Sequence, residues 1–573
     1  MQAARNGFGT VGGGRTPAFR RYPFVVLGSL LIAALAVAPI VALVVIALGG
    51  ETSVWPHLLS TVLPRATMTT GLLMLGVGIC TATLGVAGAW LVSMCRFPGR
   101  GVFEWMLLLP LAVPTYVVAY SYVEILDSVG PVQSLIRSVF GFETVRDYWF
   151  PDIRTLTGAI FVMSFVLYPY VYLTVRATFL MQSMCVLDVS RTLGKSAFGA
   201  FFNVALPLAR PAVVVGVTLA LMECINDIGA VQFLGVPTLT LSVYSTWTNR
   251  GDLAGAAQIA CVMLLVVLFL VWLERRGRRM QRFHHTSQRM QALPDYPLHG
   301  WRAAAAVAAC AAPVLIGFVF PALYLLSAAL RRFSIDFGPA YFTLTANSVG
   351  LSMVASAVAV AAALVLAYSA RLTGSRSVAV LSRVASVGYA VPGTVLAIGI
   401  LMPLAALDNA VDGLARSLLG VSTGLLLTGS TAALVYAYAT RFLAVSHGTV
   451  EAGLQRVTPN IDLAARSLGR TPAAAMREVH LPLLRPAVTT AALLVFVDSM
   501  KELPATMLLR PFNFETLATY VYTFASMEMV DRGAIAALTI VVAGLVPVAL
   551  LARTSRIPQR GSNAAVRGTV PSV

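Results

Sequence analysis

Charged side chains are scarce in this sequence, and the positive ones are almost all of one type. Only 11% of the 573 residues are charged, against about 25% in a typical soluble protein. Lys195 and Lys501 are the only lysines, so the net charge of +17 comes from arginine. Hydrophobic residues make up 58% of the chain, more than a soluble core buries without leaving large apolar patches. This composition excludes an ordinary soluble protein and predicts burial in a lipid bilayer.

Residues that usually build catalytic or metal sites are few and scattered. The six cysteines lie mostly inside apolar runs, without metal-ligand or disulfide spacing. Only two of the six histidines, His284 and His285, are adjacent, and we expect this arginine-rich stretch to be solvated. Gly194-Lys195-Ser196 resembles the end of a phosphate-binding loop, but Val189 stands where that motif needs glycine. We therefore expect no cofactor, no resident metal and no enzymatic activity in this chain.

Long apolar runs divide the sequence into two groups of six. A helix needs about 20 apolar residues to cross a bilayer. The runs are 24–48, 68–93, 103–123, 158–175, 212–234 and 256–273, then 303–330, 348–368, 378–404, 425–443, 487–509 and 533–551. The first is too long for the apolar region of a signal peptide. They predict an all-α integral membrane protein of about 12 transmembrane helices, in a first half (24–273) and a second half (303–552).

The arginines indicate how these helices are oriented. They gather in the N-terminal tail (1–23), after the second and eighth runs, in the linker 274–302 and in the C-terminal tail (553–573). Cytoplasmic loops of membrane proteins carry an excess of Arg and Lys. The pattern predicts that both termini and the linker face the cytoplasm. Nucleic-acid binding would be another use of a basic chain, but no soluble domain remains for it.

A block of sequence between the fourth and fifth runs of each half is repeated without a gap. Residues 188–194 align with 463–469, and residues 204–212 align with 479–487. Because both copies run in the same direction, the chain is a parallel duplication. We define the first loop as residues 185–211 and the second loop as residues 460–486.

Each loop is expected to form a helix, a turn, a second helix and a re-entry into the membrane. Glycine permits the turn, and the Leu-Pro and Arg-Pro pairs are expected to stop the second helix before the next span. One interpretation is an amphipathic loop resting on the membrane surface. The other is a docking element for a symmetric cytoplasmic partner.

The spacing of the repeated block resembles the signature of importer permeases that work with binding proteins and ABC ATPases. That signature is Glu-Ala-Ala, three residues, Gly, nine residues, a β-branched residue, one residue and Leu-Pro. The first half keeps an acid, Asp188, without the alanines, whereas the second keeps the alanines and has Leu463 in place of the acid. In that family the loop inserts into a groove of the ATPase. The resemblance implies these docking residues: Asp188, Arg191, Gly194, Leu206, Pro207 and Arg210, with Asp462, Ala464, Ala465, Arg466, Gly469, Leu481, Pro482 and Arg485.

Longer strings resemble the ferric-iron branch of these permeases. They are residues 109–116, 130–133, 441–445 and 501–506, and the layout with two halves in one chain is also similar. The resemblance implies a type I ABC importer permease in a bacterial inner membrane. It further implies two copies of a cytoplasmic ATPase, which bind the ATP and Mg, and a periplasmic binding protein.

Other functions stay open at this point. Fused permeases for thiamine and for phosphonates share the two-half layout. An ion-coupled secondary carrier also uses internal repeats, although the docking signature argues against it. A membrane-embedded enzyme would need a nucleophile and a base, and no such constellation is seen.

Acidic and tyrosine side chains inside the runs are candidates for a translocation path. Tyr116, Tyr120 and Glu124 recur every four residues, which places them on one helix face. Glu223 and Asp227 are expected one turn apart, and the equivalent acids of the second half are Asp498 and Glu502. Acids inside a spanning helix usually face a cavity or a partner, and hard cations prefer oxygen ligands. The alternatives are interfacial anchoring by the tyrosines and polar contacts between helices.

Overall fold

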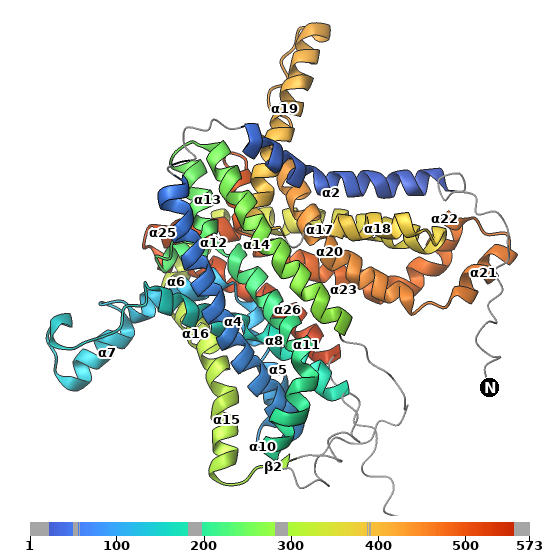
Figure 1. Ribbon diagram of the computed structural model, residues 1–573. Helices are drawn as coiled ribbons and strands as arrows, with labels where there is room; N and C mark the ends of the chain where they lie inside the picture. The colour runs from blue at the N-terminus through green and yellow to red at the C-terminus, as the bar shows by residue number, and fades with distance from the viewer. Residues whose placement is uncertain are drawn as a thin grey trace, which may run out of the picture. The chain divides into compact units, whose positions relative to one another are not determined.

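The computed structural model describes residues 22–49, 56, 58–181, 197–280, 296–386, 388 and 391–554. Helices dominate these segments (Figure 1), which confirms the expected all-α fold. Their only strands are β1 (Cys95–Arg96) and β2 (Tyr296–Pro297), which pair in parallel. This pairing holds the end of the linker beside the loop that follows the second span.

The helices of the first half and the second half follow a similar order. Those of the first half are α2 (Pro23–Gly49), η1 (Leu58–Val62), α4 (Leu63–Met94), α5 (Arg100–Met106), η2 (Leu109–Ala112), α6 (Thr115–Leu126), α7 (Pro131–Phe140), η3 (Val145–Asp147), α8 (Leu156–Met181), α10 (Ala197–Ala200), η4 (Phe201–Ala205), α11 (Leu206–Asn226), α12 (Ile228–Phe233), α13 (Leu239–Thr248) and α14 (Leu253–Met280). Those of the second half are α15 (Trp301–Val314), η5 (Leu315–Val319), α16 (Phe320–Asp336), α17 (Pro339–Thr373), α18 (Arg376–Ala385), α19 (Gly393–Leu419), α20 (Thr431–Gln455), α21 (Pro459–Ser467), α22 (Pro472–Ala475), η7 (Met476–His480), α23 (Leu481–Met500), α24 (Pro504–Leu509), α25 (Leu517–Ser526) and α26 (Val530–Thr554).

Ten of the described helices are long and apolar enough to cross a membrane, and eleven spans result if one bent pair is counted. The bent pair corrects the prediction of one straight helix over 103–123, because its two parts meet at 90°. Val113 is extended there (φ −103°, ψ 126°), as the residue before a proline tends to be. The ninth run, 378–404, is likewise two helices, since α18 ends at Ala385 and α19 begins after Pro392. The run 425–443 matches α20 only from Thr431 onward.

The expectation that prolines stop the helix before the fifth and eleventh spans is wrong. The helix continues as one span in each half, over Phe201–Asn226 and over Pro472–Met500. A π-helical turn, η4 or η7, precedes Pro207 and Pro482 in the two halves. Such a turn hydrogen-bonds i to i+5 and so accommodates a proline whose N–H is missing. Both spans also end earlier than expected, at Asn226 and Met500.

The described chain divides into two compact units that do not coincide with the two sequence halves. Unit 1 comprises residues 1–46, 349–499 and 508–512, and unit 2 comprises residues 47–348, 500–507 and 513–573. Most of α2 therefore packs with helices of the second half, and α15, α16 and α26 pack with helices of the first half.

Small residues and backbone oxygens join α2 to the rest of unit 1. Ala33 and Ala36 belong to one buried cluster with residues of α17, α18, α20 and α23. The Tyr436 hydroxyl donates to the Leu35 carbonyl over 2.6 Å. Gly399 lies so close to the Pro39 carbonyl that a Cβ would clash with it. Close approach of backbones at small residues is the usual packing mode of membrane helices.

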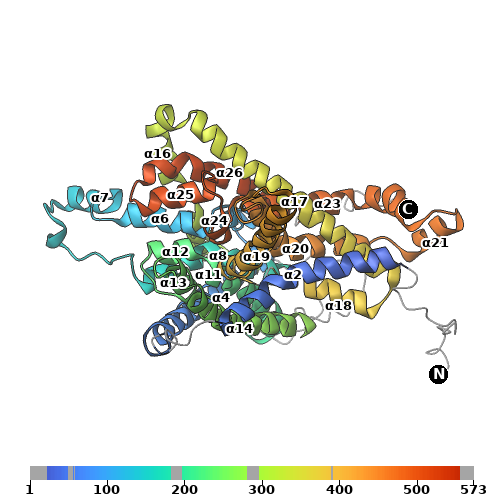
Figure 2. The ribbon, with the colours of Figure 1, turned by 90° about the horizontal axis from the view of Figure 1, so that it is seen from above.

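In unit 2, α8 packs against α4 and α11, and α16 and α25 both contact α26 (Figure 2). The turn between α15 and α16 contacts the first-half helices. The Tyr122 hydroxyl donates to the Ile316 carbonyl over 2.7 Å, and Gly317 abuts the Phe165 carbonyl.

A matched pair of hydrogen bonds confirms the internal repeat in three dimensions. The Leu239 N–H, at the start of α13, donates to the Thr70 hydroxyl of α4 over 3.0 Å. The Leu517 N–H, at the start of α25, donates to the Ser348 hydroxyl of α17 over 2.7 Å. Equivalent helices of the two halves are thus fixed by equivalent contacts.

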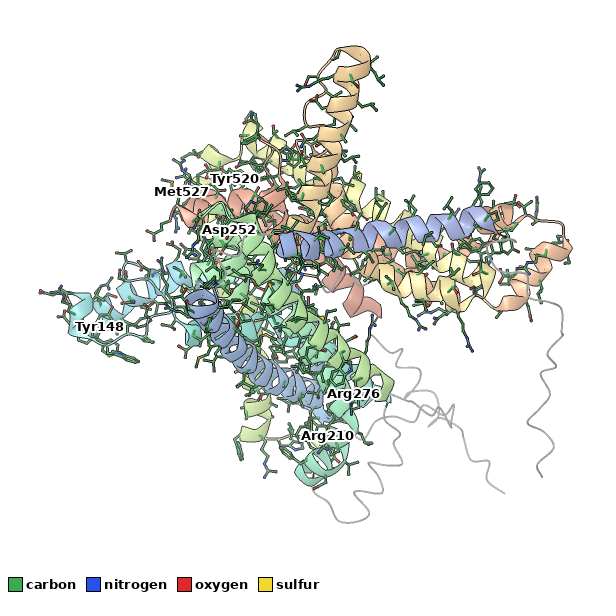
Figure 3. The ribbon with its side chains drawn as sticks, turned by 45° about the horizontal axis from the view of Figure 1, so that its top comes forward. Tyr148, Arg210, Asp252, Arg276, Tyr520 and Met527 are labelled. Atoms are coloured by element: carbon green, nitrogen blue, oxygen red, sulfur yellow. The ribbon has the colours of Figure 1, made fainter. Side chains whose placement is uncertain are left out.

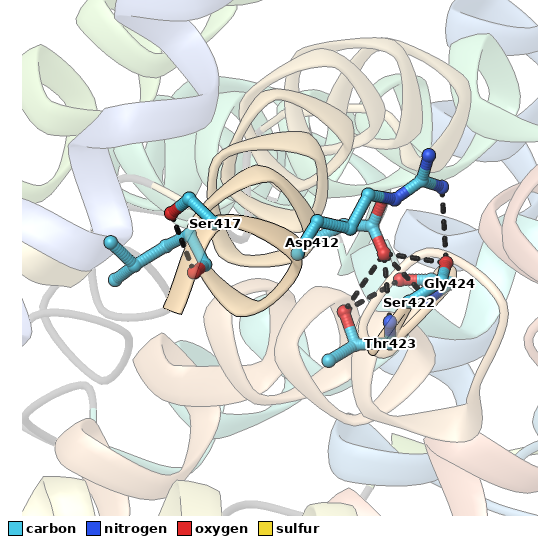
Figure 4. Close-up of polar contacts among 7 residues, drawn as sticks. Asp412, Ser417, Ser422, Thr423 and Gly424 are labelled. Atoms are coloured by element: carbon cyan, nitrogen blue, oxygen red, sulfur yellow. Dashed lines mark hydrogen bonds and ion pairs between the residues drawn. The ribbon is translucent and has the colours of Figure 1, made fainter. Parts of the chain in front are cut away.

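The halves differ where α19 turns back toward α20. The Asp412 carboxylate accepts from the Ser422 hydroxyl and from the N–H groups of Thr423 and Gly424 (Figure 4). Asp408, one turn earlier, accepts from the Leu427 and Thr428 N–H groups. Two carboxylates of α19 therefore fold the loop 420–430 back onto the helix.

Candidate functional site

The second loop has the helix and the glycine turn that its sequence predicts. Helix α21 ends at Ser467, and Gly469 has φ +72°, in the left-handed region that glycine adopts most easily. The Arg470 N–H donates to the Ala465 carbonyl over 3.0 Å, which closes the end of the helix. A second helical segment then begins at Pro472 and leads into α23.

The exposed face of this loop is apolar and basic. Leu463 is 61% exposed and Leu468 is 79% exposed. Of the other residues that the signature implies, Ala464, Arg466, Gly469, Leu481, Pro482 and Arg485 are also exposed, and Ala465 is buried.

Asp462, which we expected to belong to the docking surface, instead faces other residues of unit 1. Its carboxylate accepts from Arg371 Nε over 2.9 Å and lies 2.7 Å from His480 Nε2. Arg371 is at the end of α17, and His480 is the last residue of η7. These three side chains connect α21, α17 and the start of the eleventh span, and we call them the Asp462 cluster.

The first loop is only partly described. Asp188, Arg191 and Gly194 lie outside the described residues. Leu206 and Pro207 are partly buried at the start of α11, and Arg210 is exposed. Figure 3 places Arg210 and Arg276 toward one end of unit 2, and Asp252, Tyr520 and Met527 toward the other.

The tyrosine stripe lies on α6 as expected. Tyr116 and Tyr120 are 4% and 2% exposed, and Glu124 is partly buried near the end of the helix. Among the described residues, the Tyr120 hydroxyl has no hydrogen-bond partner. A cavity of about 580 Å³ adjoins Glu124, with Tyr324, Arg331 and Asp531 among its lining residues.

The prediction that Glu223 and Asp227 share one helix face is wrong. Helix α11 ends at Asn226, and the Asp227 carboxylate accepts from the Ala230 N–H over 2.8 Å, which caps α12. Glu502 does the same in the other half, since it accepts from the Ala505 N–H over 3.2 Å at the start of α24. Both acids stand at helix breaks because a carboxylate there satisfies backbone N–H groups that the broken helix leaves free.

The two helix breaks meet in unit 2. A Cβ added to Gly229 would lie 2.6 Å from the Tyr116 Cβ and 3.0 Å from the Leu503 Cδ2. Asp227 is also within electrostatic range of Glu223 and Glu502. The structure thus brings Tyr116, Asp227 and Glu502 into one neighbourhood, whereas Asp498 belongs to unit 1. No group of three His, Cys, Asp or Glu side chains in the described segments is placed to hold a metal ion.

Sequence reasoning missed two members of the Asp462 cluster. The arginine pattern predicts only that Arg371 lies on the basic cytoplasmic face, and His480 has no histidine beside it. Arg371 is 91 positions from Asp462, so no local pattern connects them. The sequence did contain one signal for His480. The ungapped repeat has alanine, Ala205, at the equivalent position, so only the second half has a polar side chain there.

The sequence is similar to inner-membrane permeases of known transport systems. Residues 82–282 match the family of binding-protein-dependent transport system inner membrane components. An Fe(3+)-transport system permease protein of Haemophilus influenzae is 25% identical over 491 residues, which are 84% of this chain and 88% of that protein. A molybdenum transport system permease protein of Escherichia coli is 26% identical over 34% of this chain and 86% of its own length. A sulfate transport system permease protein of Escherichia coli is 28% identical over 35% of this chain and 73% of its own length.

Proposed function

We propose that this chain is the permease subunit of an ATP-driven ABC importer, most specifically a fused permease for ferric iron. The observation that carries the proposal is the similarity to an Fe(3+) permease across 84% of the chain. The repeated block supports it independently, because it occurs twice, at the equivalent place of each half. The matches to the molybdenum and sulfate permeases cover only about a third of the chain. They support the class of transporter and not the identity of the transported solute.

Two copies of a cytoplasmic ATPase would each receive one loop. The exposed Leu463 and Leu468 offer apolar area to a groove, and the exposed Arg466 lies between them in sequence. The pairing of β1 with β2 supports a common side for the loop after the second span and the linker. A periplasmic binding protein would deliver cargo at the opposite face, and closure of the ATPases would open the path outward.

The proposed path passes the neighbourhood of Tyr116, Asp227 and Glu502. Asp227 and Glu502 already cap helices, so their carboxylates are held in place and are not flexible ligands. The buried Tyr120 hydroxyl has no partner among the described residues and is available to a passing hydrated ion. Weak, dispersed oxygen contacts suit a path, because a tight site would retain its cargo.

The coupling test compares two glycines that differ in backbone conformation, Gly469 in the second loop and Gly448 in α20. Gly469 and Gly448 both have open space where a Cβ would point, but only Gly469 has a positive φ. In proteoliposomes with the ATPase and the binding protein, Gly469→Val is expected to lower uptake per ATP hydrolysed, and Gly448→Val is expected to retain it. We expect Gly194→Val to resemble Gly469→Val. Full uptake in the double variant Gly194→Val/Gly469→Val would contradict a docking role for the loops.

The substrate test measures uptake of labelled ferric iron, thiamine, molybdate and sulfate by the same preparation. Ferric iron alone is expected to accumulate, and only when ATP and the binding protein are present. Tyr120→Phe, which removes just the hydroxyl, is expected to lower the rate of iron uptake while the amount of inserted protein is unchanged. Uptake of another solute without iron would reject the iron assignment, and uptake abolished by an uncoupler despite ATP would favour an ion-coupled carrier.

A further inference from the structure

The Asp462 carboxylate is held from two directions by charged or polar side chains. Arg371 contacts Asp462 Oδ2 through both Nε (2.9 Å) and its terminal nitrogen (2.8 Å). His480 Nε2 lies 2.7 Å from the other oxygen, Oδ1. Hydrogen bonds to an ionised carboxylate are about twice as strong as neutral ones. With both oxygens engaged inside unit 1, Asp462 is not presented to a partner on the exposed face of α21.

Helix α17 holds the loop at further points along its length. Arg371 also donates to the Leu454 carbonyl over 2.6 Å and to the Thr458 carbonyl over 3.2 Å, just before α21. The Tyr368 hydroxyl donates to the Pro472 carbonyl over 2.8 Å, just after the glycine turn. Tyr368 and Arg371 lie one helical turn apart on α17. Together they contact the chain before, within and after α21.

His480 connects this arrangement to the eleventh span. Its side chain is fully buried, and its ring packs against Tyr368 with centroids 5.4 Å apart. It ends the π-helical turn that runs directly into α23. A movement of α21 would therefore pass through Asp462 and His480 into α23, and through Asp462 and Arg371 into α17.

The first half has no counterpart of Asp462 or His480. In the ungapped register of the repeat, Leu187 stands in place of Asp462 and Ala205 in place of His480. Ala205 also ends a π-helical turn, so the backbone context of His480 is retained while the side chain is lost. In this register, the sequence of the first loop therefore has no counterpart of the acid and the histidine that the second loop uses.

We propose that Arg371, Asp462 and His480 are positioning residues that fix the second docking helix rigidly to α17 and α23. This proposal rests on the proposed function and deepens it. The second loop transmits ATPase closure as part of one rigid body, through an acid and a histidine that have no counterpart in the register of the first loop. Asp462 then acts inside the permease and not at the ATPase contact.

The test compares His480→Ala, His480→Gln and Asp462→Asn in the full-length permease. His480→Ala installs the residue that the first half has, and His480→Gln keeps an N–H donor for Asp462. Hydrogen–deuterium exchange of the amides of 459–480 is expected to be about tenfold faster in His480→Ala, as for loss of one hydrogen bond to a charged group. His480→Gln is expected to keep exchange near the wild-type rate, and amides of α4 and α8 should be unaffected in all variants.

A second measurement separates positioning from ATPase binding. We expect the His480→Ala permease to retain its ATPase during co-purification, to hydrolyse ATP, and to import less labelled ferric iron per ATP. Unchanged exchange in His480→Ala and Asp462→Asn would overturn the proposal, as would loss of the ATPase from Asp462→Asn alone. If the wild-type complex itself transports nothing, the proposed function fails, while the exchange result still decides whether the Asp462 cluster holds the helix.

Discussion

At the scale of single residues, the packing of unit 2 depends on positions without a side chain. A Cβ on Gly85 of α4 would lie 2.6 Å from the Val171 Cβ and 2.8 Å from the Tyr172 nitrogen. A Cβ on Gly216 of α11 would lie 2.6 Å from the Val171 Cα. Helix α8 is therefore held between two glycines, at a distance that no larger residue permits.

Gly85→Ala is expected to destabilise the protein, because neither Val171 nor the α8 backbone has room to move away. Overpacking of this kind costs about 1–3 kcal/mol. Gly71→Ala is the matched control in the same helix, since nothing lies within 4 Å of its added Cβ. It should stabilise α4 by roughly 0.5–1 kcal/mol. Thermal unfolding in detergent, followed by circular dichroism, measures both, and equal midpoints for the two variants would contradict this account of the packing.

Residue roles were the part of the site that sequence reasoning predicted least well. The signature suggested that Asp462 belongs to the docking surface, and it gave no sign that Arg371 and His480 contact both oxygens of its carboxylate. Asp227 and Glu502 were expected to share helix faces with Glu223 and Asp498, but both stand beyond a helix end. A sequence shows that an acid is present, whereas the contacts of that acid depend on chain segments far away.

At the scale of elements, hydropathy predicted where the membrane helices exist and failed where they break. Both halves break at a Val-Pro pair, Val113-Pro114 and Val391-Pro392, inside runs that their overall hydropathy predicts to be single spans. An apolar run carries no periodic signal for such a break, and the same chain accepts Pro211 and Pro486 inside continuous helices. Pro39 and Pro169 also lie inside continuous helices, so a proline alone does not mark where a helix breaks.

The hydroxyls of Thr70 and Ser348 are expected to be needed to seat α13 and α25. Each accepts a buried backbone N–H from the first residue of the short helix. Thr70→Val and Ser348→Ala leave that N–H without a partner, which costs about 1–3 kcal/mol. Thr83→Val is the control, because the exposed Thr83 hydroxyl bonds only to Ile79 of its own helix. Faster proteolysis near 234–239 or 510–517 in the two test variants, but not in the control, would support the role, and identical cleavage in all three would refute it.

At the scale of the whole molecule, the arginine pattern predicts which loops share a side of the membrane. Reporter fusions after Arg289 and after Asp412 are expected to report opposite sides, with Arg289 in the cytoplasm. The pairing of Cys95–Arg96 with Tyr296–Pro297 agrees with this, because it brings two predicted cytoplasmic segments together. Equal reporter signals from the two fusions would reject the topology.

The compact units imply that neither sequence half is a complete folding unit. Helix α2 of the first half has its hydrogen bond from Tyr436 and its close contact with Gly399 in the second half. The α15–α16 turn of the second half has its contacts with Tyr122 and Phe165 in the first. The sequence repeat alone suggested two self-contained six-helix halves, because a repeat records ancestry and not which helices pack together.

A chain cut within the linker therefore tests this exchange of helices. When residues 1–288 and 289–573 are co-expressed as separate chains, they are expected to co-purify in detergent, because each supplies helices that the other needs. Either chain expressed alone should accumulate to a much lower level. The helices that pack on the other chain would then expose small-residue faces and backbone carbonyls that have lost their partners. As the control, the chain 58–288, which lacks α2, is expected to bind 289–573 less well than 1–288 does, because only the contacts around α15 and α16 remain. If each half is stable alone and the two do not associate, the units are independent and the exchange does not hold the protein together.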